Sequence, residues 1–194
     1  MTVLTRGDLM SLETYSDERN TIRAEVMAHK KTRHVGVGPN TTLYFEDRRT
    51  VQYQIQEMLR IEKIFTADGI QEELDTYNPM IPSGRNWKAT FMIEYVDVDE
   101  RQKMLAKLIG IERATWIQVG DLDKVTPIAN EDLERETEDK TSSVHFLRFE
   151  LTNEMAEAAK SGAPIAMGIS HENYDHKVAP VAEDIRISLV NDLA

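Results

Sequence analysis

Hydrophobic positions in roughly the first 80 residues recur at the spacing of helices. Cap residues and apolar spacing predict a short helix from Thr5 to about Tyr15 and a second from Ser16 to about Lys31. Asp47 or Thr50 is expected to cap a third helix through "QYQIQEMLR". Between the second and third, "VGVGPNTTLYFE" is typical of a β-hairpin.

The second half of the chain alternates between strand and helix patterns. Strands are predicted for "ATFMIEYV", "TWIQVG", "VTPIA", "SVHFLRFEL" and "PIAMGIS". Helices are predicted for "DERQKMLAKLIG", "NEMAEAAKSG" and residues 180–193, and a helix or helical turn for the acidic "NEDLERETEDK". We therefore expect an α+β fold with a largely antiparallel mixed sheet packed against helices. The expected organisation is one domain over residues 1–194, helical to about residue 80 and sheet-rich from about 81.

The segment "VQYQIQEMLRIEKIF" contains polar residues among its apolar ones. At about 100° per residue, Glu62 lies about 20° from Val51, near the middle of the apolar arc. Gln54 falls inside the arc, whereas Gln56 and Arg60 fall on the opposite side. A buried carboxylate needs a cation, hydrogen-bond donors, a metal or a proton. Glu62 is therefore expected either in a structural ion pair, in a functional site, or at the surface if the helical phase is wrong.

The strand "VHFLRFEL" places a histidine on its apolar face. With a period of two, His145 shares a face with Leu147, and Arg148 lies on the other face. A core histidine with satisfied hydrogen bonds is the favoured interpretation, and a ligand or acid–base role is the alternative. Glu62 and His145 are expected to line one internal region, with Arg85 and Arg148 as partner cations. These four residues are the candidate catalytic residues.

Composition narrows the classes of function. Lys and Arg number 23 and Asp and Glu number 34, so the net charge is −11. Such a surface disfavours binding to nucleic acid or to anionic lipid. The chain has no Cys, which excludes disulfides, thiolate metal sites and cysteine nucleophiles. Because neither a signal peptide nor a long apolar segment is evident, a cytoplasmic protein is expected.

One local cluster contains residue types that bind metals. In "SHENYDH", His171 and His176 accompany Glu172 and Asp175, and imidazole with carboxylate suits divalent cations. In a polar segment such a cluster is more often solvated surface. We therefore expect no metal site and no cofactor, with His171 and His176 as the weaker alternative.

Three long segments carry a family resemblance. They are "QYQIQEMLRIEKIF", "GIQEELDTYNPMIPSGRNWKATFMIE" and "ANEDLERETEDKTSSVHFLRFEL". Together they resemble the bacterial family catalogued as domain of unknown function 3501, over nearly the whole chain. The family provides no established activity to transfer to particular residues. Its members tend to be encoded near a rubrerythrin and an iron–sulfur oxidoreductase, which implies a role in peroxide or redox stress.

Two hypotheses follow. The first is an accessory or interaction protein in such a redox system, with a protein partner that carries the electrons. The second is an enzyme or metal-binding protein in which Arg85 or Arg148 holds a small anionic substrate and Glu62 or His145 moves a proton. Neither the substrate, the partner nor the oligomeric state follows from the sequence.

Overall fold

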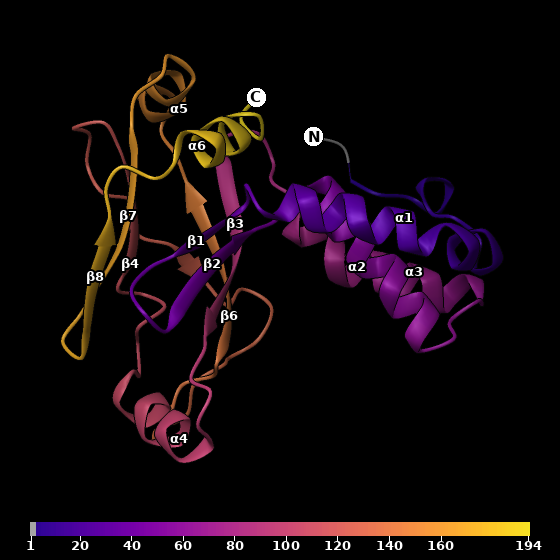
Figure 1. Cartoon of the computed structure of the whole chain (residues 1–194), viewed down its shortest axis with the longest axis horizontal. Helices are drawn as coiled ribbons and strands as arrows, with labels where there is room; N and C mark the ends of the chain where they lie inside the picture. The colour runs from indigo at the N-terminus through magenta and orange to yellow at the C-terminus, as the bar shows by residue number, and fades with distance from the viewer. Residues whose placement is uncertain (1–2) are drawn as a thin grey trace.

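The computed structural model describes residues 3–194 and has an α+β architecture with two antiparallel sheets in this range (Figure 1). The five-stranded sheet has the order β1-β2-β3-β6-β5 and the three-stranded sheet the order β4-β7-β8. The strands are β1 (His34–Gly36), β2 (Thr41–Phe45), β3 (Asn86–Ile93), β4 (Thr115–Val119), β5 (Ile128–Ala129), β6 (Val144–Glu150), β7 (Ile165–His171) and β8 (Tyr174–Val178).

In residues 3–194, three α-helices fall within the first 80 residues, two connect later strands, and one follows the last strand. The α-helices are α1 (Leu12–Lys30), α2 (Arg48–Ile61), α3 (Ala67–Tyr77), α4 (Val98–Lys107), α5 (Asn153–Lys160) and α6 (Glu183–Val190). Two 3₁₀ turns, η1 (Arg6–Asp8) and η2 (Asn78–Met80), complete the set within the described residues. The predicted helical N-terminal part and the α+β class are thus confirmed.

The main hydrophobic core lies between the two sheets. One cluster joins buried residues of the five-stranded sheet, such as Trp87 and Phe149, to buried residues of the three-stranded sheet, such as Ile117 and Met167. Strands β3 and β6 form the centre of the larger sheet, in a register that sets Trp87 opposite Phe149. Alternation along β6 turns His145, Leu147 and Phe149 inward and leaves Phe146 and Arg148 on the outer face.

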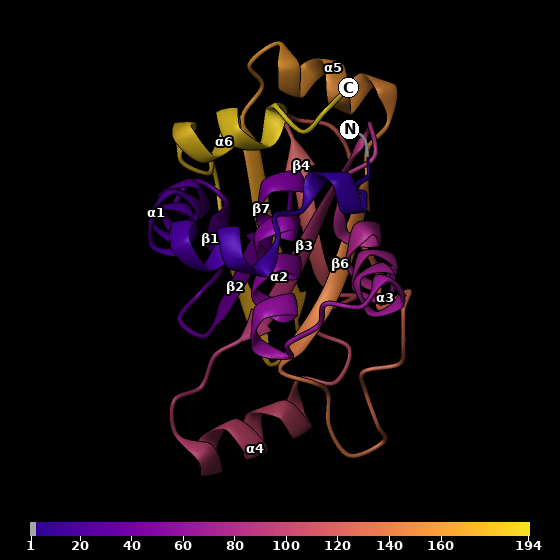
Figure 2. The same ribbon diagram turned by 90° about the vertical axis from the view of Figure 1, so that its right-hand side faces the viewer.

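Helices α1 to α3 have a second, smaller core of their own. It contains Val51, Ile55 and Leu59 of α2 together with Leu74 of α3. Figures 1 and 2 show these helices beside the five-stranded sheet, on the side away from the three-stranded one. The outer face of β3 and β6 therefore looks toward the helices.

A buried arginine ties the helical part to the sheets and to the C-terminal helix. Arg33, which is 2% exposed, donates to the carbonyl oxygens of Phe45 (3.1 Å) and Glu46 (2.9 Å). Its guanidinium also binds both carboxylate oxygens of Asp192, at 2.6 and 3.3 Å. Burial raises the pKa of Asp192 to about 6, against the opposing effect of Arg33. Arg33 therefore holds together the chain segments at the ends of α1, β2 and α6.

The N-terminal helices differ from the prediction. A single helix runs through the predicted boundary near Ser16, and Ser11 caps it by accepting from the backbone N–H of Thr14. Tyr15 is buried and donates to Glu57 of α2 (2.7 Å), which also accepts from Arg19. These contacts with α2 stabilise the helix across a boundary that local cap signals had suggested.

Residues 131–140 form bends and an isolated β-bridge from Glu136 to Thr141, so the predicted acidic helix or helical turn is wrong. The acids of this segment recur at i and i+4, as Asp132 with Glu136, and like charges at that spacing destabilise a helix. The acids instead pair with arginines elsewhere, including Glu131 with Arg148 and Glu136 with Arg113.

Strand β8 was not predicted. Its first residue, Tyr174, is buried, and its hydroxyl donates to the carbonyl oxygen of Val37 (3.0 Å) and accepts from the N–H of Asn40 (2.9 Å). The polar character of "YDHKV" hides this strand in the sequence, because most of its residues face solvent.

Candidate functional site

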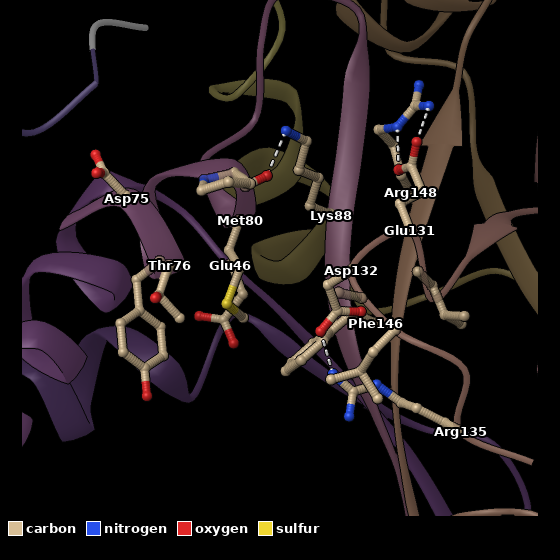
Figure 3. A pocket seen from close by; sticks show the side chains of 15 residues that line it. Glu46, Asp75, Thr76, Met80, Lys88, Glu131, Asp132, Arg135, Phe146 and Arg148 are labelled. Carbon is tan, nitrogen blue, oxygen red and sulfur yellow. Dashed lines mark hydrogen bonds and ion pairs between the residues drawn. The ribbon is translucent and has the colours of Figure 1, made fainter. Parts of the chain in front are cut away.

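A groove of about 570 Å³ lies between the helical part and the outer face of the five-stranded sheet (Figure 3). Residues of α3 and η2, including Thr76 and Met80, form one side. The other side comes from β3, β6 and the segment between β5 and β6. The apolar lining residues are Tyr77, Pro79, Met80, Ala89, Leu133, Phe146 and Leu147. A mostly apolar cavity of this size is typical of small-molecule sites.

Local sequence explains how these side chains reach the groove. Pro79 in the first turn of η2 ends α3 and turns the chain, because it cannot continue the hydrogen-bond pattern of the helix. The side chain of Asn78 fixes this turn by bonding the backbone N–H (2.8 Å) and carbonyl (2.9 Å) of Leu4. On the sheet side, the register sets Lys88 opposite Arg148 and Thr90 opposite Phe146.

The strand edge of the groove has a bidentate ion pair. Arg148 donates from Nε and Nη2 to the two carboxylate oxygens of Glu131, each at 2.7 Å, and also bonds Glu150. The bond to Glu131 is the main reason that the pKa of Arg148 is raised, and the pKa of Glu131 is lowered by the same bond. Such planar pairs are geometrically specific. Arg148 therefore holds the segment after β5 against the sheet.

A second arginine lies over an aromatic ring of the groove. The guanidinium carbon of Arg135 is 4.5 Å from the centre of the Phe146 ring, within the range of a cation–π contact. Arg135 also pairs with Asp132. Its Nε is buried and has no acceptor among the described residues.

Lys88 supplies a partly buried ammonium group to the groove. Its Nζ donates to the carbonyl oxygen of Pro79 at 2.6 Å, and within residues 3–194 no carboxylate lies at ion-pair distance from it. Burial, followed by the nearby charge of Arg148, lowers the pKa of Lys88. In contrast, Glu46 has both oxygens engaged, by the hydroxyls of Thr50 (2.6 Å) and Thr90 (2.8 Å).

Of the four residues predicted from the sequence, Arg148 lines this groove. Arg85 is exposed and donates to the side chain of Asn153 at 2.6 Å. His145 lies on the opposite face of β6 from Arg148, as expected from the alternation. The structure therefore does not bring the four residues together.

The predicted burial of His145 is confirmed. The side chain is 0% exposed and contacts Asn130 through Nδ1 (3.0 Å) and Thr141 through Nε2 (3.0 Å). Nε2 also lies 3.0 Å from the carbonyl oxygen of Ser142. Burial lowers the pKa of His145, against the opposing charge of Glu112. These contacts describe a core histidine with its hydrogen bonds satisfied.

The predicted burial of Glu62 is wrong, and so is the expectation that it shares a network with His145. Helix α2 ends at Ile61 and Glu62 is its exposed C-cap. Lys63 then adopts a positive φ of 55°, and the N–H of Ile64 bonds the carbonyl of Leu59 at 2.9 Å, a Schellman motif. Ile64 thereby packs on the apolar cluster in the place that periodicity had given to Glu62.

The buried polar residue of α2 is Gln56, which the helical phase had placed on the opposite side. It is 3% exposed, and its side chain bonds the backbone N–H of Met10 at 2.6 Å and the carbonyl of Met10 at 3.4 Å. Gln54 is half-buried. The chain before α1 covers this side of α2, and periodicity within one helix does not reveal such a cover.

His171 and His176 lie on the neighbouring strands β7 and β8. His171 contacts the carbonyl oxygen of Ile109 (3.1 Å), and His176 packs edge-on against the ring of Tyr174. No group of three or more His, Asp or Glu side chains in residues 3–194 is arranged to hold a metal ion. The same residues include no helix that is both long and apolar enough to cross a membrane.

The groove residues that sequence reasoning missed are Met80, Lys88 and Phe146. Each comes from a different element, and none forms a motif with its sequence neighbours. The available signal was the alternation in "NWKATFMI" and "VHFLRFEL", which places Lys88 and Phe146 on the faces turned away from Trp87 and His145. It does not show what lies over those faces.

Comparison with known proteins identifies a matching family and a solved structure of the same fold. The family model described as "Protein of unknown function (DUF3501)" matches residues 3–193. The crystal structure of a novel protein of unknown function from Burkholderia pseudomallei is 48% identical, with a TM-score of 0.94 and 100% of both chains covered. No curated protein matches the chain.

Proposed function

Because the chain belongs to the DUF3501 family, whose description names no activity, we propose from its geometry that it is an accessory protein that binds a ligand without transforming it. The observation that carries this proposal is the groove beside Met80 and Phe146, which combines an apolar lining with charges that are mostly paired internally. Pairs such as Arg148 with Glu131 hold the walls of the groove in place.

The separation of the candidate catalytic residues also supports a binding role. An enzyme built on Glu62 and His145 would need both groups at one site. Glu62 is exposed at the end of α2, and His145 is enclosed in the sheet core with its ring nitrogens engaged. Neither residue lines the groove.

We expect phenylnaphthylamine, a neutral dye that fluoresces in apolar sites, to bind the protein, and Met80→Asp to weaken its binding about tenfold or more. The new carboxylate would have to lose water against an apolar ligand. Fluorescence titration measures the dissociation constant, and circular dichroism checks that the variant folds.

The matched control is Met27→Asp, because Met27 is 37% exposed on α1 and does not line the groove. This variant should bind the dye as the natural chain does. Absence of dye binding to the natural chain, or equal weakening by both variants, would reject the groove as a ligand site.

We also propose that the protein acts in the cytoplasm beside a rubrerythrin and an iron–sulfur oxidoreductase in peroxide stress. The support is the genomic setting implied by the family, and the lack of Cys is compatible with a partner chain that carries the electrons. Purified rubrerythrin and oxidoreductase from the same genome should each be tested by biolayer interferometry. Binding of at least one partner in the micromolar range is expected, and failure of both to bind would remove the redox assignment while leaving the groove untouched.

A further inference from the structure

We infer that the ligand of the groove is an amphipathic anion, with its acidic head group bound by Lys88 and its apolar body between Met80 and Phe146. The inference rests on the proposed function and specifies the chemical class of the ligand. Figure 3 shows the side chain of Lys88 extending from β3 toward the chain around Met80, with Phe146 also on the sheet side.

The hydrogen-bond donors of the groove are incompletely used. An ammonium group has three donors, and the Nζ of Lys88 has one acceptor, the carbonyl oxygen of Pro79. Within residues 3–194 it has no carboxylate partner at ion-pair distance. An acceptor atom on a bound ligand could take a further hydrogen bond from Nζ. This bond would be strongest if the acceptor were ionised.

The acids of the groove, in contrast, each have a hydrogen-bond donor, although within the described part of the chain the exposed Asp75 accepts through one oxygen only. Glu131 accepts two bonds from Arg148, and Asp132 pairs with Arg135. Glu46 accepts from Thr50 and Thr90, and Asp75 accepts from Gln71 at 2.8 Å. A cationic ligand would have to compete with these partners, whereas an anionic ligand meets an ammonium group that has a carbonyl oxygen but no carboxylate at ion-pair distance within residues 3–194.

Burial of Lys88 favours an anion, whereas the nearby carboxylates of Glu131 and Glu150, both paired with Arg148, act in the opposite direction. Burial lowers the pKa of the Lys88 ammonium, so the charged form lacks part of the solvation it would have in water. An anionic head group at Nζ would replace that solvation. The net charge of −11 repels anions at long range, but a Debye length of about 8 Å at physiological salt limits this effect to the approach.

The apolar body of the ligand has a defined place. Met80 is a flexible, polarisable side chain suited to irregular ligands. Phe146 offers a ring with Arg135 against it at 4.5 Å from the ring centre. A flat or chain-like apolar group therefore fits between η2 and β6, with its acid directed to β3.

Two dyes that differ in one group test the inference. Anilinonaphthalene sulfonate carries the apolar framework of phenylnaphthylamine and adds a sulfonate. Because a hydrogen bond to a charged group contributes more than a neutral one, the sulfonate is expected to bind about tenfold more tightly than the neutral dye at physiological salt. Fluorescence titration of the natural chain measures both dissociation constants.

Lys88→Met assigns the preference to this residue. The variant should bind both dyes with about the affinity that the natural chain has for the neutral one, and Lys88→Arg should retain the preference for the sulfonate. Lys177→Met is the matched control, since Lys177 is exposed on β8 away from the groove. Its affinities should match those of the natural chain.

The outcomes separate the inference from the proposed function. If the neutral dye binds but the sulfonate binds no more tightly, or if Lys88→Met keeps the preference, the anion assignment is wrong and the groove remains a ligand site. If neither dye binds the natural chain, the proposed function itself fails. The first comparison uses the natural chain alone, so it stands even if Lys88→Met does not fold.

Discussion

Replacing Arg33 with methionine is expected to lower the free energy of unfolding by about 3–5 kcal/mol, the usual cost of breaking a buried ion pair. Arg33 is 2% exposed and its side chain is shared among the ends of three elements. Its loss would leave Asp192 buried without its cation, and two carbonyl oxygens, those of Phe45 and Glu46, would lose a donor. The methyl group of methionine can replace none of these bonds.

Urea denaturation followed by circular dichroism measures this change, and the melting temperature should fall by about 6–20 °C. Arg49→Met provides the comparison, because Arg49 is half-exposed and pairs with the exposed Glu25. That variant should stay within about 0.5 kcal/mol of the natural chain, as surface substitutions do. If the two variants lost equal stability, the network around Arg33 would not be the connection between helices and sheets.

Trp87→Ala is the second substitution with a large expected effect, about 3–5 kcal/mol. Trp87 is 0% exposed on β3, at the centre of the core between the sheets. Its indole Nε1 donates to the carbonyl oxygen of Leu189 in α6 at 2.8 Å. Truncation therefore opens a large cavity and also removes the donor that holds α6 to the sheet.

A graded series distinguishes these two contributions. Trp87→Phe keeps most of the apolar volume but loses the N–H, so a cost of about 1–3 kcal/mol is expected from the carbonyl that loses its donor. Equilibrium unfolding in urea gives both values. A cost for Trp87→Ala near 1 kcal/mol, the average for all substitutions, would contradict the packing of this core.

Short-range rules in the sequence were reliable where neighbouring residues decide the outcome. His145 faces the core because alternation along a strand depends only on backbone geometry. Asp47 caps α2, and Thr152 caps α5, because a side-chain oxygen reaches an N–H two or three residues later. The strand β6 and the hairpin of β1 and β2 were also predicted correctly.

Predictions failed where distant segments compete with local preference. Periodicity placed Glu62 in the core, but the helix ends one residue earlier and the partly buried Ile64 packs on the apolar cluster instead. Gln56 is buried because Met10, 46 residues away, covers it. The groove belongs to this second class, since Met80, Lys88 and Phe146 meet only after the helices are placed over the sheet.

The position of Arg33 also bears on the order in which the protein forms during synthesis. Its partner Asp192 is 159 residues away, so this contact forms only after residue 192 has been synthesised. Contacts of such separation form late, because closing a long loop must precede any gain from the contact. Helices α1 to α3 can assemble early around their own small core. Their fixation to the sheets through Arg33 has to wait for Asp192, which follows α6.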